Sequence, residues 1–418
     1  MLMKSKQTAL FSRYVLDGIR QDVTPAELLE ECMIPANNAE TASCDAEDAD
    51  FAAGEAATAA QDIWDECLDQ SPESLKCTEE DFASLLEKVT AASSPAQDRA
   101  FELLYPENFT RARIASALID CLWLEGEFRL EDLRLWADWS WNSEGIGRMA
   151  AFYNSVRSAS EYIYDLGVGI MGYGYEDSEG ECVNSYFPAL AAYADTSEEE
   201  DEDMADKDWE EDDMAPERQW TVGGPDCALG MDRQVWMGDE RKCSAVLRDC
   251  PESTFLVYVP FDTCQFRLGG SLLSNCLGEG GGPAPVMDDP DYFIDCFEVV
   301  RDLVEDGVVL SSRTVCDGGL AVAAKKLAAS TGLGISLNVN GLSRAYNESD
   351  RMKLLFAEVP GVLLQFNEAD ADYVDSQFLL QDVAYYRVGT VSPDFKGVVL
   401  EPRSNGVENI IASLGGGF

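Results

Sequence analysis

The residues Asp317, Gly318 and Gly319 could bind an anion, because they stand where a strand gives way to a helix. The preceding stretch GVVLSSRTV is typical of a strand, and GGLAVAAKKLAAS is typical of a helix. We expect the Asp317 carboxylate to cap that helix by accepting free backbone N–H groups. Two glycines let a ligand approach closely, and a helix N-terminus favours negative charge, so phosphate is a candidate ligand. A capped turn that binds nothing is the plainer alternative.

Histidine is absent from all 418 residues, which limits the chemistry that the chain can perform. Its absence excludes Ser-His-Asp and Cys-His hydrolysis, the zincin motif and every metal site built on imidazole. Any acid–base step must use carboxylates, Lys, Tyr or Cys. The 13 cysteines form no C-x-x-C pair, so we expect neither a zinc ribbon nor a thioredoxin motif. Most should be reduced residues of the core in a cytoplasmic protein.

The formal net charge of −48 restricts the partners of the chain. Repulsion on this scale argues against nucleic acid and against an anionic membrane surface. It fits cation-rich surroundings, a solvated acidic surface or a basic partner. No run reaches the roughly 18 apolar residues that a membrane span requires. The first 21 residues lack the apolar core of a signal peptide and predict an amphipathic helix.

The first part of the chain, residues 1–107, predicts a helical, partly disordered acidic region. An Ala/Asp/Glu-rich linker occupies 37–62, and Thr78 and Asp81 have the spacing of a capping box before a helix. The acidic run at 195–217 predicts a solvated loop. The alternative for this run is a docking site for a basic partner or divalent cations.

The rest of the chain alternates predicted strands and helices, which indicates an α+β fold. STFLVYVPFD, LLFAEVPGVLLQF and AYYRVGTVS each predict a strand. Two long amphipathic helices are expected, one of which ends at Gly167. Their predicted buried positions are Met149, Phe152, Val156 and Ile163 in the first and Phe293, Phe297, Val300 and Val304 in the second.

Four short motifs, in this order, resemble the C-terminal module of the aminoimidazole ribonucleotide synthetase superfamily. They are Leu-Gly-Gly-Ser at Leu268–Ser271, Asp-Gly-Gly-Leu at Asp317–Leu320, Leu-Phe-x-Glu at Leu355–Glu358 and Val-Gly-x-Val at Val388–Val391. Within the superfamily they are most similar to the phosphoribosylformylglycinamidine synthases, in the second of their two module pairs. The stretches ASALIDCLW and GYGYEDSEG resemble the companion N-terminal module more faintly.

The resemblance implies a two-module synthetase-like architecture with mixed sheets. The N-terminal module would span 108–242, the C-terminal module 243–404, and a tail 405–418. The family reaction uses Mg-ATP to convert the amide of formylglycinamide ribonucleotide into an amidine. The expected partners are therefore a nucleotide or ribonucleotide, and either a homodimer or a similar module paired with this chain.

The resemblance also implies a nucleotide and Mg²⁺ site in a cleft between the modules, although it assigns no catalytic residue. The metal ligands it implies are Asp120 and Asp177. The cofactor-binding residues it implies are Asp177, Ser178, Gly269, Gly270, Ser271, Asp317, Gly318 and Gly319.

Several positions depart from the family pattern. Ser116 replaces the Mg²⁺-binding Glu, and Glu176 replaces a phosphate-facing Lys, which would repel a polyphosphate. The residues at 313–316 read Arg-Thr-Val-Cys instead of His-Asp-x-Ser, and without histidine no Cys-His glutaminase is expected. Two further hypotheses therefore stand beside the ligase: a catalytically lapsed scaffold or regulatory subunit, and a superfamily member acting on another small acid.

Two other stretches could be mistaken for ligand sites. We expect Trp136, Trp139 and Trp141 to pack in the core rather than to stack on a ligand. The glycine-rich segment 278–282 predicts a flexible loop, because no Lys or Ser/Thr follows it at the spacing of a P-loop.

Overall fold

A computed structural model describes the chain in eleven stretches that fall into two compact units. The described residues are 8–16, 18–33, 75, 77–93, 103–124, 128–145, 147–178, 180, 182–190, 241–250 and 253–403. The first unit comprises Met1–Asp69 and Glu102–Glu240, and the second comprises Gln70–Phe101 and Arg241–Phe418. The linker at 37–62, the acidic run at 195–217 and the tail at 405–418 lie outside the described residues. The module boundaries drawn from the sequence remain predictions.

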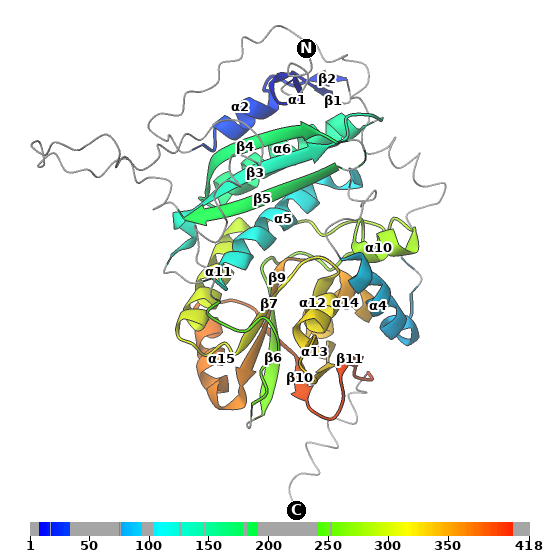
Figure 1. Cartoon of the computed structure of the whole chain (residues 1–418), viewed down its shortest axis with the longest axis vertical. Helices are drawn as coiled ribbons and strands as arrows, with labels where there is room; N and C mark the ends of the chain where they lie inside the picture. Colours follow the sequence, from blue (N-terminus) through cyan, green and yellow to red (C-terminus); the bar gives the residue numbers. More distant parts are fainter. Residues whose placement is uncertain are drawn as a thin grey trace, which may run out of the picture. The chain divides into compact units, whose positions relative to one another are not determined.

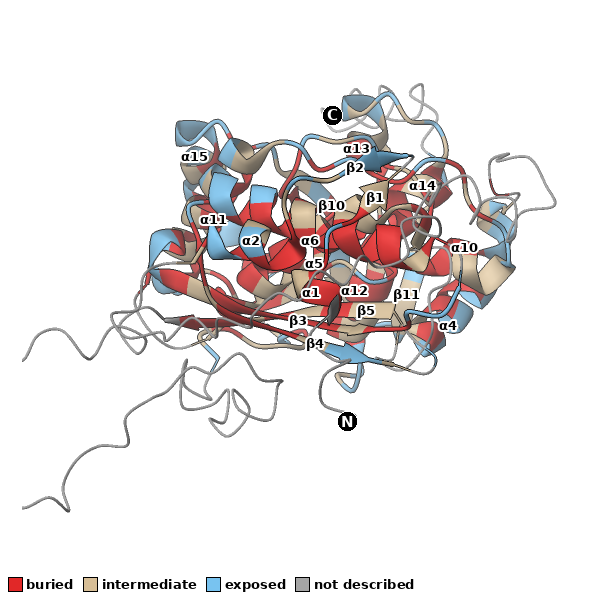
Figure 2. Cartoon of the chain, turned by 90° about the horizontal axis from the view of Figure 1, so that it is seen from above, coloured by how far each residue is buried: buried red, intermediate tan, exposed pale blue. Residues whose placement is uncertain are grey.

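The first unit is built on a three-stranded sheet of order β4-β3-β5. Strand β3 (Leu133–Trp141) pairs in parallel with β4 (Gly169–Asp177) and antiparallel with β5 (Cys182–Leu190). Helices α5 (Pro106–Cys121) and α6 (Arg148–Asp165) lie on one face of this sheet (Figures 1 and 2).

The buried face of α6 confirms the predicted helix. Met149, Phe152, Val156 and Ile163 are all buried, and Gly167 follows the helix with a φ of +69°. The tryptophans of β3 are also core residues, as predicted. Trp136, Trp139 and Trp141 expose 1%, 0% and 3% of their surface. Alternation along the strand points Trp139 toward α6, where its ring meets Phe152 edge-on.

The prediction of an amphipathic helix over the first 21 residues is wrong in the described part. Helix α1 covers only Thr8–Phe11, and a short hairpin follows, formed by β1 (Val15–Leu16) and β2 (Ile19–Arg20). Gly18 has a φ of +77°, a conformation that glycine adopts without strain and that tight hairpin turns require. The hairpin leads into α2 (Pro25–Glu30), which Thr24 and Glu27 cap reciprocally.

The second unit is built on a six-stranded mixed sheet of order β11-β8-β10-β6-β9-β7. Only the pair β11 and β8 is parallel, and the other neighbours are antiparallel. The fold class predicted from the sequence, α+β with mixed sheets, is therefore confirmed. The strands are β6 (Thr254–Pro260), β7 (Ser311–Val315), β8 (Gly334–Leu337), β9 (Gly361–Asn367), β10 (Tyr386–Ser392) and β11 (Gly397–Leu400).

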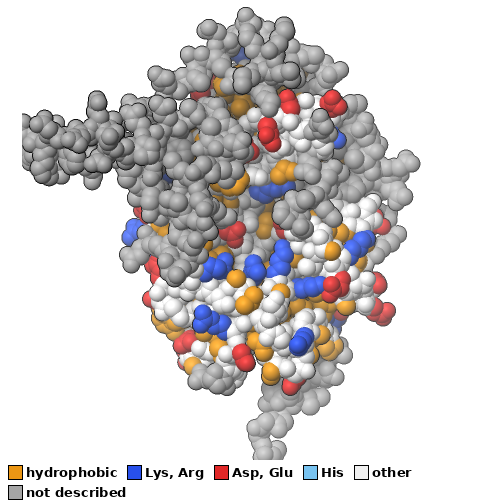
Figure 3. All heavy atoms as spheres, viewed as in Figure 1, with side chains coloured by type: hydrophobic (Ala, Val, Ile, Leu, Met, Phe, Trp, Pro, Cys, Tyr) orange, Lys and Arg blue, Asp and Glu red, His pale blue; other side chains and the backbone are white. Residues whose placement is uncertain are grey.

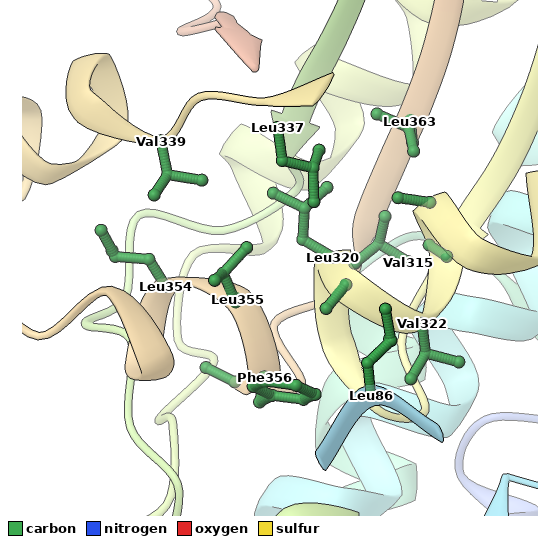
Figure 4. Packing of buried hydrophobic residues seen from close by; sticks show 14 of the residues in the cluster. Leu86, Val315, Leu320, Val322, Leu337, Val339, Leu354, Leu355, Phe356 and Leu363 are labelled. Atoms are coloured by element: carbon green, nitrogen blue, oxygen red, sulfur yellow. The ribbon is translucent and has the colours of Figure 1, made fainter. Parts of the chain in front are cut away.

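Helices cover this sheet and fill the core of the second unit. The helices are α4 (Phe82–Ala92), α10 (Leu272–Leu277), α11 (Pro290–Glu305), α12 (Gly319–Ala328), α13 (Asn340–Ala345), α14 (Arg351–Phe356) and α15 (Ala371–Leu380). The predicted apolar stripe of α11 is buried. Figure 4 shows side chains of α4, α12 and α14 close together, among them Leu86, Val322 and Phe356.

One predicted strand is half helix. The letters LLF of LLFAEVPGVLLQF close α14, and β9 begins only at Gly361. Pro360 separates the two elements, and the residue before a proline is biased toward extended backbone.

Helix α4 belongs to the second unit, where it packs on α10 and α12. Thr78 precedes it, and its hydroxyl donates to the Asp81 carboxylate at 2.7 Å. The neighbouring Glu79 forms ion pairs with Arg351 at 3.1 Å and with Arg403 at 2.7 Å. These pairs join residue 79 to the C-terminal part of the chain.

Among the helices that the structure describes, none has the length and apolar character needed to cross a lipid bilayer.

Candidate functional site

The start of α12 differs from the sequence prediction. The helix begins at Gly319, and Gly318 rather than Asp317 occupies the N-cap position, so the predicted Asp317 cap is wrong. Gly318 has a φ of +76°, and a Cβ there would lie 2.5 Å from Val322 Cγ2. A glycine fits this position because a side chain would be both strained and crowded.

Gly319 is held against the end of α14. Its N–H donates to the Cys316 carbonyl at 2.8 Å, and its φ is +68°. A Cβ on Gly319 would lie 2.7 Å from the Ala357 oxygen and 2.8 Å from the Leu355 oxygen. The absence of a side chain at Gly319 is therefore what lets the turn and the helix end approach each other.

Glu358, the residue after Ala357, supplies the cap that Asp317 was expected to provide. Its Oε1 atom accepts the Gly318 N–H at 2.7 Å and the Leu272 N–H at 3.0 Å. Glu358 is only 3% exposed. Its carboxylate thus lies at the start of α12, where the helix dipole stabilises a negative charge, and it ties that turn to the first residue of α10.

The Leu-Gly-Gly-Ser motif packs against the glycine-rich segment 278–282 and the residue after it. The Gly269 N–H donates to Pro283 O at 2.9 Å, and the Gly270 N–H donates to Gly280 O at 3.3 Å. A Cβ on Gly269 would lie 2.1 Å from Gly282 O. These glycines therefore allow two backbone segments to pass close to each other.

Ser271 is the N-cap of α10 and is almost fully buried. Its hydroxyl donates to Leu268 O at 2.8 Å and accepts from the Ser274 N–H at 3.3 Å. Both hydrogen bonds hold the start of α10 in place.

The Glu358 carboxylate therefore joins two of the four motifs that carry the family resemblance, its own and Asp317–Leu320, to Leu272, the residue that follows the Leu-Gly-Gly-Ser motif. The fourth motif lies in β10, where Val388 O accepts the Asn338 N–H at 2.7 Å. The N–H groups of Gly318 and Gly319 and the hydroxyl of Ser271 all have partners within the chain. Their assignment as cofactor-binding residues stays a prediction.

The remaining predicted site residues lie in the first unit. Asp177 is the last residue of β4, is exposed, and accepts from the Tyr175 hydroxyl at 2.9 Å. The Ser178 N–H donates to Trp141 O at 3.0 Å. Asp120 is half-buried in the last turn of α5, about two helical turns beyond Arg113, which donates to Asn184 of β5.

The described residues contain no group of three or more Asp, Glu, Cys or His placed to hold a metal ion. Mg²⁺ is commonly held by one or two carboxylates together with substrate phosphates. The assignment of Asp120 and Asp177 as its ligands stays a prediction. Their convergence with the Gly-Gly turn, which belongs to the other unit, also stays a prediction.

Two acidic residues, Asp138 of β3 and Glu176 of β4, lie near each other on neighbouring strands. Glu176, in the place of the family Lys, is exposed and accepts from the Ser140 hydroxyl at 3.2 Å. Asp138 is 8% exposed, and its Oδ1 atom has no hydrogen-bond partner. Burial, with a smaller effect of the Glu176 charge, raises the pKa of Asp138 from 3.8 to about 6.

Sequence reasoning did not single out Asp138 or Glu358 as individual residues. The signal for Glu358 was present, because it closes the Leu-Phe-x-Glu motif. The signal for Asp138 is an acidic residue between tryptophans in a strand, in WADWSW.

Comparison with known families agrees with the motifs. Residues 268–400, which contain the Gly-Gly turn and Glu358, match the family described as AIR synthase related protein, C-terminal domain. This part of the chain is therefore similar to an AIR synthase-related domain. The matched residues include α10, α11, the strands β7 to β11 and the helices between those strands.

The curated relatives carry the similarity further along the chain. A probable phosphoribosylformylglycinamidine synthase, chloroplastic/mitochondrial, of Arabidopsis thaliana is 25% identical over 299 residues, which are 69% of this chain and 18% of the relative. The human phosphoribosylformylglycinamidine synthase is 31% identical over 115 residues, which are 28% of this chain and 8% of the relative. The chain thus spans less than a fifth of the length of these relatives.

Among solved structures, T. maritima PurL complexed with FGAR is similar to 71% of this chain and 41% of its own. The sequence identity is 13% and the TM-score is 0.47.

Proposed function

We propose that this chain is a purine-biosynthesis ligase of the phosphoribosylformylglycinamidine synthase kind, which converts an amide into an amidine with ATP. The similarity to such synthases over 299 residues supports the proposal. So does the hydrogen bond that joins two family motifs at Glu358, within residues 268–400 that match the AIR synthase related family. The contact of the Asp317–Leu320 motif with Glu358 is the structural observation that carries it.

The proposed substrate is a ribonucleotide amide, and Mg-ATP is the proposed co-substrate. ATP when bound would activate the amide oxygen, so that ammonia can displace it. Asp120 and Asp177 are the residues proposed to hold Mg²⁺, as oxygen ligands that this hard cation prefers. We also propose a cytoplasmic setting, which the free thiols of all cysteines in the described stretches favour.

The test is ATP turnover by the full chain with formylglycinamide ribonucleotide and ammonium. We expect phosphate release that requires both, and that falls by at least about a hundredfold in Asp120→Ala and Asp177→Ala, because a metal-held phosphate loses much of its charge stabilisation. Asp165→Ala, an exposed carboxylate at the end of α6, is the matched control and should keep the rate. Turnover that is absent, or that is unchanged in all three variants, contradicts the proposal.

A second candidate is a catalytically lapsed scaffold or regulatory subunit that pairs with a similar module. The observations that favour it are the intrachain partners of the Gly318 and Gly319 N–H groups and the exposed Glu176. A folded chain without turnover that forms a stable complex with itself or with a related synthase, measured by light scattering, would support this candidate.

A further inference from the structure

Glu358 occupies the position that a bound anion would take at the start of α12. We propose that its carboxylate is the resident anion of the Gly-Gly turn, where it positions the turn against Leu272 and excludes free phosphate. The proposal goes beyond the proposed function and does not rest on it. The contact of Glu358 with Gly318 and Leu272 lies within the chain and requires neither ATP nor a ribonucleotide.

The hydrogen-bond donors of the turn are the first argument. One oxygen of Glu358 receives two N–H groups, at 2.7 Å from Gly318 and 3.0 Å from Leu272. The next N–H along the turn, that of Gly319, is bonded to Cys316 O. A phosphate at this place would have to take N–H groups that already have partners.

The space in front of the turn is the second argument. The backbone oxygens of Leu355 and Ala357 lie within 2.8 Å of the position that a Cβ on Gly319 would take. Leu320, the residue after Gly319, is 1% exposed, and Phe356, between Leu355 and Ala357 in the sequence, is 0% exposed. The segment that carries Glu358 therefore fills the approach to the turn, and a ligand would have to displace it.

Charge is the third argument. A carboxylate and a phosphate at the same two donors would repel each other, and their repulsion is stronger in a buried place than in water. The helix dipole and the N–H groups can satisfy one anion, and the chain supplies that anion itself. Glu358 is in this sense a positioning residue that sets the distance between two loops.

Truncation of Glu358 should create a binding site for a small carboxylate. Glu358→Ala leaves two converging N–H groups and a gap of the size of the lost side-chain carboxylate. Formate is planar, carries one negative charge and is small enough to enter such a gap, whereas phosphate is larger. Glu358→Gln keeps an oxygen that can accept both N–H groups, although it loses the charge.

The first experiment is thermal unfolding of the full chain in sodium formate and in sodium chloride at equal ionic strength. We expect Glu358→Ala to unfold at a lower temperature than Glu358→Gln, and to be stabilised saturably by formate but not by chloride. The wild type should show no such difference. Asp350→Ala is the matched control, because Asp350 caps α14 at 2.9 Å from the Met352 N–H without linking two loops. Equal effects of formate and chloride on Glu358→Ala would overturn the proposal.

The second experiment, which does not require Glu358→Ala to fold, is amide hydrogen exchange of the wild-type chain and of Glu358→Gln. The Leu272 and Gly318 amides should both be protected, and both should exchange at least about tenfold faster in Glu358→Gln, since a neutral acceptor holds them more weakly. Protection of only one of the two amides in the wild type, or unchanged rates in Glu358→Gln, would show that the carboxylate does not hold the turn. Saturable protection of the wild-type Gly318 amide by inorganic phosphate would equally overturn the exclusion of phosphate.

Discussion

Glu358 and Asp138 are both buried carboxylates, and they differ in the donors around them. Glu358 receives two backbone N–H groups through one oxygen, and these bonds stabilise its negative charge. Asp138 has an oxygen without any partner and lies near the negative charge of Glu176. Burial therefore favours the protonated form of Asp138 and raises its pKa to about 6.

The stability of the first unit should depend on pH through Asp138. Between its ordinary value of 3.8 and about 6, the folded chain holds a proton that the unfolded chain has lost. The contribution of this proton to the free energy of unfolding is therefore fully present below about pH 4 and is lost as the pH rises through 6. The size of the loss is about 2–3 kcal/mol.

Asp138→Asn removes the titration, so its advantage over the wild type in urea unfolding should appear as the pH rises from 5 to 7. Glu131→Gln, an exposed change just before β3, is the control and should leave the pH profile unchanged. An Asp138→Asn profile parallel to that of the wild type would refute the assignment.

At the residue scale, the sequence predicts which motifs matter better than it predicts the partner of each residue. Asp317 was the expected cap because helix caps usually lie next to the helix that they cap. The observed acceptor lies 40 residues away, on the far side of α12, β8, α13 and α14. Only tertiary packing brings Glu358 to the turn, so no local rule could have assigned it.

At the scale of elements, two glycines with the same backbone conformation differ in what surrounds them. Gly319 and Gly307 have φ values of +68° and +72°. A Cβ on Gly319 would meet two carbonyl oxygens, and a Cβ on Gly307 would meet nothing within 4 Å. The first position is constrained by packing and conformation, the second by conformation alone.

Gly319→Ala should therefore destabilise the second unit more than Gly307→Ala. We expect about 1 kcal/mol for Gly307→Ala, the usual cost of a left-handed residue with a side chain, and at least about 3 kcal/mol for Gly319→Ala. Urea unfolding of both variants measures the difference. Equal losses would mean that the approach of the turn to the end of α14 adds nothing to stability.

The elements themselves followed the sequence wherever hydrophobic periodicity was long. Helices α6 and α11 repeat their apolar positions over several turns, and both buried the predicted side chains. The elements that were predicted wrongly are short. The hairpin after α1 is set by one glycine in a left-handed turn, and LLF joined α14 instead of β9 because three apolar residues suit either element.

At the scale of the whole molecule, the sequence predicted the α+β class and the similarity to the AIR synthase family, but not the arrangement within each unit. Helix α4, which the sequence placed in an acidic N-terminal region, packs in the second unit and is joined to Arg351 and Arg403 through Glu79. Arg351 is 2% exposed, so its charge depends on such a partner. Contacts over more than 250 residues of sequence are invisible to local patterns.

Charge is also unevenly distributed over the molecule. The chain carries a net charge of −48, and the charged residues of the run at 195–217 are all acidic except Lys207. On the face seen in Figure 3, Lys and Arg side chains are spread over the second unit, with Asp and Glu side chains beside them and along its edges. Long-range repulsion should weaken the binding of any polyphosphate at low salt, and molar salt should screen it.

The most direct test of the proposed ligase is a thermal-shift titration of the full chain with Mg-ATP at low and at molar salt. We predict saturable stabilisation, which reaches about 2.7 kcal/mol when the nucleotide is at a hundred times its dissociation constant. It should be lost in Asp120→Ala and Asp177→Ala and kept in Asp165→Ala. A folded chain whose unfolding temperature does not respond to Mg-ATP at either salt concentration would contradict the proposed function.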